Sequence, residues 1–340
     1  MKMAWNVAVL GATGAVGEMM LSILAERKFP VDQIYALASS RSVGEVVNFG
    51  RESLEVLDAE TFDWSQVQIA FFSAGAAVSA KYAPLAAEAG CVVIDNTSQF
   101  RYEADIPLVV PEVNPEDLAF YRERHIIANP NCSTIQMLVA LKPIHDVAGI
   151  ERINVVTFQS VSGTGKKAIS ELTHQTGEML NGRPAEPTVY KQPIAFNVIP
   201  QIDVFQQNGY TKEEMKMVWE TRKMLHNDSI LVNATAVRVP VVYGHSEAIH
   251  IETTRKIYAD EARELLKNAP GVVVVDDLDE SAYPTALTHA SGEDAVYVGR
   301  IREDISHPNG LNLWVVSDNI RKGAALNAVQ IAEKLIADVF

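Results

Sequence analysis

The sequence predicts an α/β chain of two domains, in which a doubly wound domain precedes an α+β domain with a mixed, largely antiparallel sheet. Short apolar runs alternate with helical stretches over the first 130 residues. Such alternation is typical of a parallel sheet covered by helices on both faces. Beyond Cys132 the candidate strands carry polar/apolar alternation or many β-branched residues, which indicates a sheet of the mixed kind.

Composition limits the classes of partner. The chain has 340 residues, 48% of them hydrophobic and 21% charged, which suits two folded domains with a sizeable core. A net charge of -14 argues against nucleic acid or an anionic membrane as the main partner. No signal peptide opens the chain and no apolar run of about 18 residues appears, so we expect a cytoplasmic protein.

Cysteine is scarce in this sequence. Only Cys91 and Cys132 are present, so neither a disulfide framework nor a cysteine-rich metal site is expected. We therefore predict no metal.

The elements of the first domain follow from the apolar runs. Strands are predicted at residues 5–10, 34–38, 67–72, 91–94 and 125–128. A helix is predicted over 14–27, where Val16, Met19, Met20 and Ile23 recur at helical spacing. The first strand, turn and helix together form the start of a Rossmann-type domain.

The second domain opens with an apolar helix from Ser133 to about His145. Later helices are predicted at 166–180, 212–225, 259–267 and 321–340, the last being long and amphipathic. The proline-bearing stretch 181–197 is predicted to be irregular. Predicted strands cover 153–160, 231–239, 248–253, 272–275, 295–301 and 313–316.

The turn after the first strand is a dinucleotide-binding signature. Gly11 allows a tight turn, Gly14 lets the backbone approach a pyrophosphate, and Gly17 permits close packing of helix on strand. The intervening residues Thr13, Ala15 and Val16 belong to the same predicted cofactor site. A purely structural strand-to-helix turn is the alternative, and the position after an N-terminal strand favours the cofactor.

The end of the second strand indicates which cofactor binds. An NAD site usually places an acidic residue there for the ribose hydroxyls, but residues 36–42 contain none. Arg41, beside Ser42, suits a 2′-phosphate because guanidinium forks onto phosphate oxygens. We predict NADP, with a solvated surface arginine as the alternative.

Cys132 begins the apolar helix of the second domain, in the segment Asn131-Cys132-Ser133-Thr134. The partial positive charge at a helix N-terminus favours thiolate over thiol. The same N–H groups are suited to stabilise an oxyanion if the sulfur attacks a carbonyl. The alternative is a small buried structural cysteine.

Further candidate residues follow the cysteine. His245, with Gly244 before it, follows a strand that carries Arg238 and is a candidate acid/base. Gln159 precedes a glycine turn that could contact phosphate or nicotinamide through backbone N–H groups. Glu213 and Lys216 share a helix face, a spacing that more often gives a solvated ion pair.

These motifs, in this order, resemble the aspartate-β-semialdehyde dehydrogenase family over essentially the whole chain. The resemblance implies a fold like that of glyceraldehyde-3-phosphate dehydrogenase. It implies an NADP-binding domain at 1–131 and 319–340, with the last helix returning to it, and a catalytic and dimerisation domain at 132–318. It also implies a homodimer or a dimer of dimers built through the second domain.

The resemblance also implies roles, carried over motif by motif. The catalytic residues would be Cys132 as the nucleophile, His245 as the acid/base and Gln159 orienting the substrate. Substrate contacts would come from Arg238 on the α-carboxylate, Glu213 on the ammonium, and Arg101, Lys216 and Asn131 on the phosphate. Ser162, Gly163 and Asn319 would approach the cofactor. One departure is Ala236, where many members carry cysteine, and we expect it to affect packing more than chemistry.

The implied activity is an NADPH-dependent oxidoreductase of lysine, threonine, methionine and diaminopimelate biosynthesis. It would convert L-aspartyl-4-phosphate to L-aspartate-4-semialdehyde and phosphate through a cysteine thioester. One alternative is an N-acetylglutamyl-phosphate reductase-like enzyme, which would not need Glu213 for an ammonium. The other is a cofactor-binding homologue without catalysis, against which the full set of reactive residues argues.

Overall fold

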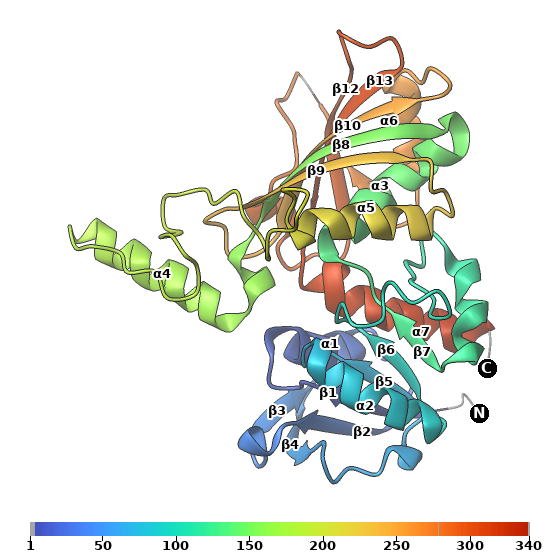
Figure 1. Ribbon diagram of the computed structural model, residues 1–340, viewed down its shortest axis with the longest axis vertical. Helices are drawn as coiled ribbons and strands as arrows, with labels where there is room; N and C mark the ends of the chain where they lie inside the picture. The colour runs from blue at the N-terminus through green and yellow to red at the C-terminus, as the bar shows by residue number, and fades with distance from the viewer. Residues whose placement is uncertain (1–3, 278, 339–340) are drawn as a thin grey trace. The chain divides into compact units, whose positions relative to one another are not determined.

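The computed structural model describes residues 4–277 and 279–338, and the chain divides into two compact units (Figure 1). Unit 1 combines the chain up to Pro130 with the segment from Ala324 onward, and unit 2 spans Asn131–Gly323. The predicted domain boundaries, after residues 131 and 318, differ from these divisions, because Asn131 and residues 319–323 belong to unit 2. The first three residues and the last two of the predicted domains lie outside the described residues.

Unit 1 is built on a seven-stranded sheet of order β3-β4-β2-β1-β5-β6-β7. The strands are β1 (Trp5–Leu10), β2 (Val31–Ala38), β3 (Val46–Phe49), β4 (Glu52–Asp58), β5 (Ile69–Phe72), β6 (Val92–Asp95) and β7 (Ile126–Ala128). All neighbouring strands run parallel except β3, which is antiparallel to β4. The Rossmann-type α/β prediction is confirmed.

The prediction of a wholly parallel sheet is wrong at the edge formed by β3. The chain reverses between β3 and β4 at Gly50, whose φ is +59°. The sequence did not predict these strands because β3 is short and β4 mixes polar with apolar residues, as in Glu52, Leu54 and Glu55, and forms no continuous apolar run.

Three helices pack in unit 1: α1 (Ala15–Glu26), α2 (Ala76–Glu88) and α7 (Leu326–Asp338). Buried residues of α1 and α7 share one hydrophobic cluster with the strands, including Met20, Leu24, Val329 and Phe71. The predicted helix 321–340 begins as a π turn, Arg321–Ala325, before α7, and its last two residues lie outside the described range. Helix α2 is rich in alanine, so its periodicity is weak and it was not predicted.

The glycine turn joins β1 to α1 by close packing. Gly11 has a φ of +91°, which favours glycine. A Cβ placed on Gly17 would lie 2.1 Å from the carbonyl oxygen of Gly11, so no larger residue fits without moving the helix. The third glycine of the motif thus serves helix–strand packing, as predicted.

Unit 2 holds a six-stranded sheet of order β11-β12-β13-β10-β8-β9. Its strands are β8 (Ile150–Gln159), β9 (Leu231–Arg238), β10 (His245–Thr253), β11 (Val272–Val274), β12 (Val296–Glu303) and β13 (Gly310–Ser317). The central pairs are antiparallel, and both edge pairs, β11 with β12 and β8 with β9, are parallel. The mixed, largely antiparallel sheet is confirmed, and β10 starts at His245 instead of the predicted residue 248.

Helix α3 (Cys132–Ala148) lies against this sheet between α5 (Lys212–Met224) and α6 (Ala259–Lys267), and α4 (Lys166–Leu180) packs on the 3-10 turn η4 (Val161–Thr164) (Figure 1). Every residue from Ser133 to Leu141 is buried, so the first half of α3 is covered on all sides. Among the described residues, no helix has both the length and the apolar character needed to cross a membrane.

Candidate active site

A cavity of about 570 Å³ lies in unit 1 beside the carboxyl ends of β1 and β2. Parallel sheets bind ligands at this edge. Of the predicted cofactor residues of this unit, Gly11, Thr13, Gly14, Arg41 and Ser42 line the cavity. Ala15, Val16 and Gly17 begin α1 and are not among the lining residues.

The sequence missed one wall of this cavity. Lys81 and Tyr82 of α2 line it, and both donate to the carboxylate of Glu60, at 2.5 and 2.7 Å. The turn before α2 also lines the cavity, through Ser73 and Ala74. The available signal was the glycine that follows this turn in the sequence, ahead of an alanine-rich stretch.

The lining of this cavity fits NADP. The 3-10 turn η1 (Ser40–Ser42) presents Arg41 with a hydroxyl on each side. Lys81 adds a second cation, and no aspartate or glutamate is among the described lining residues. A phosphate on the ribose would thus meet guanidinium, ammonium and hydroxyl groups without a competing lining carboxylate.

In unit 2, Cys132 is the first residue of α3, where it is partly buried. The preceding Asn131 caps the helix: its Oδ1 accepts from the N–H groups of Ser133 at 3.0 Å and Thr134 at 3.4 Å. These two donors were expected to be available to an oxyanion, and the cap occupies them. The helix N-terminus therefore acts on the Cys132 sulfur through its electrostatic field, and not through hydrogen bonds from these two N–H groups.

A buried carboxylate lies beside the cap. Glu213 Oε1 accepts from Asn131 Nδ2 at 2.9 Å and from Gln159 Nε2 at 3.1 Å, and Oε2 accepts from Lys216 Nζ at 2.9 Å. Burial alone would raise the pKa of Glu213, but Lys216 and the two amides outweigh it and lower the pKa to about 2. Glu213 is an ionised, positioned group and not the solvated ion-pair partner that its spacing usually indicates.

Asn131, Gln159 and Lys216 thus meet at one carboxylate. Gln159 Nε2 also contacts Ser133 Oγ at 3.0 Å, which ties β8 to the first turn of α3. Lys216 Nζ contacts Asp203 at 3.0 Å as well. The pKa of Lys216 is raised, because its attraction to Glu213 outweighs the opposing effect of burial.

His245 is fully buried at the start of β10, and its Nδ1 accepts from the Ser160 N–H at 3.1 Å. A backbone N–H is always a donor, so the neutral ring carries its proton on Nε2. Burial, followed by the positive charge of Arg238, lowers the pKa of His245 to about 3. The ring is therefore neutral at physiological pH and offers an N–H from Nε2.

A polar network holds the histidine. Asn319 Oδ1 accepts from Ser160 Oγ at 2.8 Å and from the Gly244 N–H at 3.0 Å. Asn319 Nδ2 donates to Ser162 Oγ at 3.0 Å. The two predicted cofactor contacts Ser162 and Asn319 therefore form the support of His245.

Arg238 is bonded to the same network through Ser160. Its Nη1 donates to the Ser160 carbonyl at 2.7 Å. A Cβ on Gly163 would lie 3.3 Å from Arg238 Nη1 and 3.5 Å from His245 Nε2, so glycine leaves space beside both groups. Within the described part of the chain, Arg238 Nε and His245 Nε2 are buried without hydrogen-bond partners, which suits groups that await an anionic ligand.

Gly323 is a neighbour of the cysteine that the sequence did not reveal. A Cβ on Gly323 would come within 2.8 Å of the Cys132 Cβ. The sequence gives little signal for this contact, because the two residues are separated by most of the domain.

Arg101 belongs to unit 1, where it is buried. Its Nη2 donates to the Asn96 carbonyl at 2.8 Å. The structure thus brings the other predicted substrate residues together within unit 2, whereas Arg101 belongs to unit 1.

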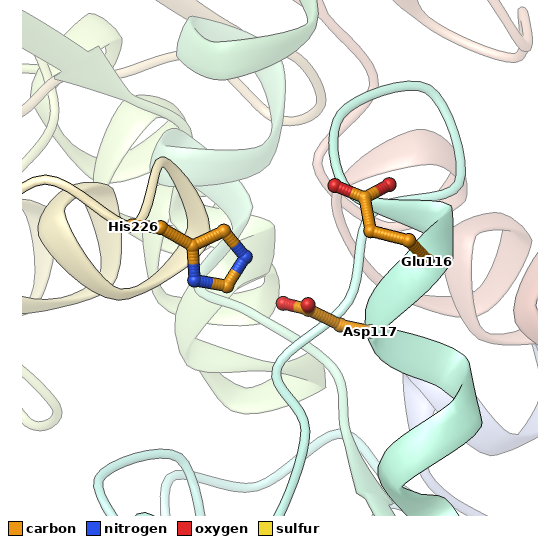
Figure 2. Close-up of side chains that lie close together, drawn as sticks. All are labelled: Glu116, Asp117 and His226. Atoms are coloured by element: carbon orange, nitrogen blue, oxygen red, sulfur yellow. The ribbon is translucent and has the colours of Figure 1, made fainter.

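Among the described residues, neither unit by itself gathers three potential metal ligands. Glu116 and Asp117 come from the 3-10 helix η3 (Pro115–Glu123) of unit 1, and His226 follows α5 in unit 2 (Figure 2). Asp117 also accepts from Asn114 at 2.7 Å. We assign no metal site to these residues.

A Rossmann-type unit with a cavity whose lining suits NADP, together with a mixed-sheet unit that presents a cysteine at a helix start, defines the class of two-domain semialdehyde dehydrogenases. Family models agree with this class. Residues 6–121 match the model "Semialdehyde dehydrogenase, NAD binding domain", and residues 141–322 match "Semialdehyde dehydrogenase, dimerisation domain".

Comparison with individual proteins identifies the family within this class. Aspartate-semialdehyde dehydrogenase of Shewanella violacea is 64% identical over 340 residues, covering 100% of both chains. That of Legionella pneumophila is 66% identical over 330 residues, covering 97% of this chain and 95% of its own. The crystal structure of aspartate semialdehyde dehydrogenase II from Vibrio cholerae, complexed with ASA, has a TM-score of 0.98 at 61% identity and covers both chains fully. This chain belongs to the aspartate-semialdehyde dehydrogenase family.

The cavity in unit 1 yields a prediction about cofactor choice. Replacing Arg41 by alanine should weaken NADP+ binding about 10- to 100-fold, because a charge-assisted hydrogen bond contributes roughly 1.5–3 kcal/mol. NAD+ binding should change little. Calorimetric titration of both cofactors measures this, with Arg51→Ala as a control outside the cavity lining. Equal losses for both cofactors would contradict the role of Arg41.

The buried histidine yields a prediction about stability. The folded chain resists protonation of His245 and the unfolded chain does not, so its contribution to stability is lost as pH falls from about 6.5 towards 3. The parent should therefore lose roughly 2 kcal/mol of its free energy of unfolding through this group by pH 5. His245→Gln should not show this loss, because glutamine does not titrate. Urea unfolding of both proteins at pH 7.5 and 5 tests the difference. His174→Gln, at an exposed position, is the control and should follow the parent at both pH values.

Proposed function

We propose that this chain catalyses the NADPH-dependent reductive dephosphorylation of L-aspartyl-4-phosphate to L-aspartate-4-semialdehyde, the phosphorylating aspartate-semialdehyde dehydrogenase reaction of lysine, threonine, methionine and diaminopimelate biosynthesis. One observation carries the proposal. Cys132 begins a buried helix whose cap is bonded to Glu213, and Glu213 is bonded in turn to Gln159. A nucleophile and groups for an amino-acid substrate are therefore built into one unit.

The substrate is an amino acid with a second, activated carboxyl group. Arg238 suits the α-carboxylate, since its Nε is buried and has no partner among the described residues. Glu213 suits the free ammonium, because its carboxylate is ionised and buried. An N-acetylated substrate would bury this charge against a neutral amide, so the geometry favours the aspartyl compound.

The acyl transfer proceeds through the cysteine. The Cys132 thiolate attacks the acyl-phosphate carbon, the C–O bond to phosphate breaks, and an acyl-thioester on Cys132 and inorganic phosphate result. Lys216, and Arg101 from unit 1, are proposed to bind the phosphate. Gln159 is proposed to orient the substrate carbonyl.

His245 acts on the oxygen of the tetrahedral adducts. Its Nε2–H is proposed to donate to the developing negative charge, while Ser160 fixes the ring through Nδ1. The sequence indicated an acid/base, and the tautomer supports the donor half of that role. Because the neutral ring has no free acceptor nitrogen, the proton of the thiol leaves by another route.

NADP fits the cavity of unit 1 through Gly11, Gly14, Arg41 and Ser42, and when bound in its reduced form it supplies the hydride that reduces the thioester. One solved relative, aspartate semialdehyde dehydrogenase with NADP from Candida albicans, has a TM-score of 0.78 at 26% identity and covers 98% of both chains. Ser162 and Gly163 remain proposed cofactor contacts.

A direct assay tests the proposal in the reverse direction. Purified protein should reduce NADP+ when given aspartate semialdehyde and phosphate, and should show little rate with N-acetylglutamate semialdehyde. Cys132→Ala should abolish turnover, by about 10⁴-fold or more, and retain NADP+ binding. Cys91→Ala, at a buried position outside the site, should stay active. No rate with aspartate semialdehyde from folded parent protein would contradict the proposal.

We also propose that the chain forms a homodimer through the face of the six-stranded sheet that lies opposite α3, α5 and α6. Helices α3, α5 and α6 pack on one face of this sheet. On the other, the strand register aligns Val156, Ala248 and Trp314 in one row. Ala248 is exposed and Val156 is 36% exposed, which is unusual for the centre of a sheet.

Ala248→Glu should therefore convert a dimer to a monomer, because it places a charge in the middle of this apolar row. Light scattering coupled to size exclusion measures the mass. Ile305→Glu, which replaces a fully exposed apolar residue between β12 and β13, is the matched control and should leave the dimer intact. A dimer that persists in Ala248→Glu would place the interface elsewhere.

A further inference from the structure

Glu220 is a buried carboxylate to which the reaction above assigns no part. It lies on α5 and is 0% exposed. Its Oε2 accepts from the backbone N–H of Asn131 at 2.6 Å. This contact joins Glu220 to Asn131, which lies far from it in the sequence and immediately precedes Cys132.

Glu220 acts at the same residue as Glu213. Seven residues separate the two glutamates, which is close to two helical turns, so they share one face of α5. Glu213 accepts the side-chain N–H of Asn131 and Glu220 accepts the main-chain N–H. Asn131 is therefore fixed on α5 through both its side chain and its backbone.

This double attachment leaves Asn131 one orientation. With both N–H groups directed at α5, its Oδ1 points to the N–H groups of Ser133 and Thr134 and caps α3. The cap sets the first turn of the helix, and Cys132 is the first residue of that turn. The negative charge of Glu220 disfavours a thiolate on Cys132, whereas the field of the helix N-terminus favours it. We therefore attribute the role of Glu220 to its hydrogen bond and not to its charge.

We propose that Glu220 is a positioning residue for the nucleophile: by accepting the Asn131 N–H it locks the turn before Cys132 to the helix that carries Glu213 and Lys216. Recognition of the substrate and placement of the sulfur then depend on one rigid element, α5. The inference deepens the proposed function and rests on it for the role of Cys132, but the attachment itself is independent of the reaction.

Two substitutions separate the hydrogen bond from the charge. Glu220→Ala removes the acceptor and leaves the Asn131 N–H buried without a partner, whereas Glu220→Gln keeps an acceptor oxygen and removes the charge. The matched control is Glu214→Ala. Glu214 is a buried carboxylate of the same helix that accepts two backbone N–H groups, those of Thr211 at 2.7 Å and Ala236 at 2.9 Å.

The readout is the rate of Cys132 alkylation by iodoacetamide between pH 5.5 and 9, followed by mass spectrometry, beside kcat and KM. The other charged or titratable groups around the site are Glu213, Lys216, Asp203, Arg238 and His245, and all stay unchanged in the Glu220 variants. The second cysteine does not interfere, since burial raises the pKa of Cys91 to about 12.

Glu220→Gln should shift the alkylation profile to lower pH and react roughly two- to ten-fold faster at pH 6.5, because a negative charge near the sulfur is gone. Its kcat should stay within about threefold of the parent. Glu220→Ala should lower kcat about 10- to 100-fold with KM changed little, because the sulfur is displaced while the substrate groups remain. Glu214→Ala should lower the melting temperature and leave the alkylation profile as in the parent.

Identical alkylation profiles in the parent and both Glu220 variants, with kcat unchanged in Glu220→Ala, would overturn the inference and leave Glu220 a structural residue like Glu214. Failure of the proposed function gives a different pattern. In that case the parent shows no dehydrogenase activity, while alkylation still responds to Glu220 as described.

Discussion

The N-terminus of α3 is the constraint on which unit 2 depends. A helix leaves its first N–H groups without partners inside the helix, and here the start of the helix is almost entirely buried. Asn131 resolves this by accepting from Ser133 and Thr134, while its own N–H groups go to two carboxylates of α5. The position of Cys132 is thus a consequence of satisfying buried backbone donors.

Burial at this site leaves Glu213 ionised and His245 neutral. Glu213 keeps its charge because Lys216 compensates for lost hydration. His245 loses its charge chiefly because burial disfavours the protonated ring and lowers its pKa, and the nearby Arg238 adds repulsion. A chain of net charge -14 therefore gathers Lys216 and Arg238 around its buried site, where local fields and not the total charge decide what binds.

Unit 1 depends on close packing at its glycine turn and on a helix from the far end of the chain. Gly17 lets α1 lie against β1, and this packing opens the cavity at the strand ends. Helix α7 adds Leu326, Val329 and Leu335 to the cluster that α1 forms with the strands. The core of unit 1 is therefore complete only after the whole of unit 2 has been synthesised.

The sequence by itself determined the fold class, the glycine turn and the nucleophile candidate, because periodicity and turn chemistry are properties of neighbouring residues. It also indicated the NADP preference, since Arg41 lies in a segment free of acids. Only the tertiary structure decided that the Asn131 amide caps α3, that Ser160 blocks Nδ1 of His245, and that Gly323 and Glu220 adjoin the cysteine turn. Those contacts join residues far apart in the chain, and their hydrogen bonds and burial exist only once the helices and strands have packed.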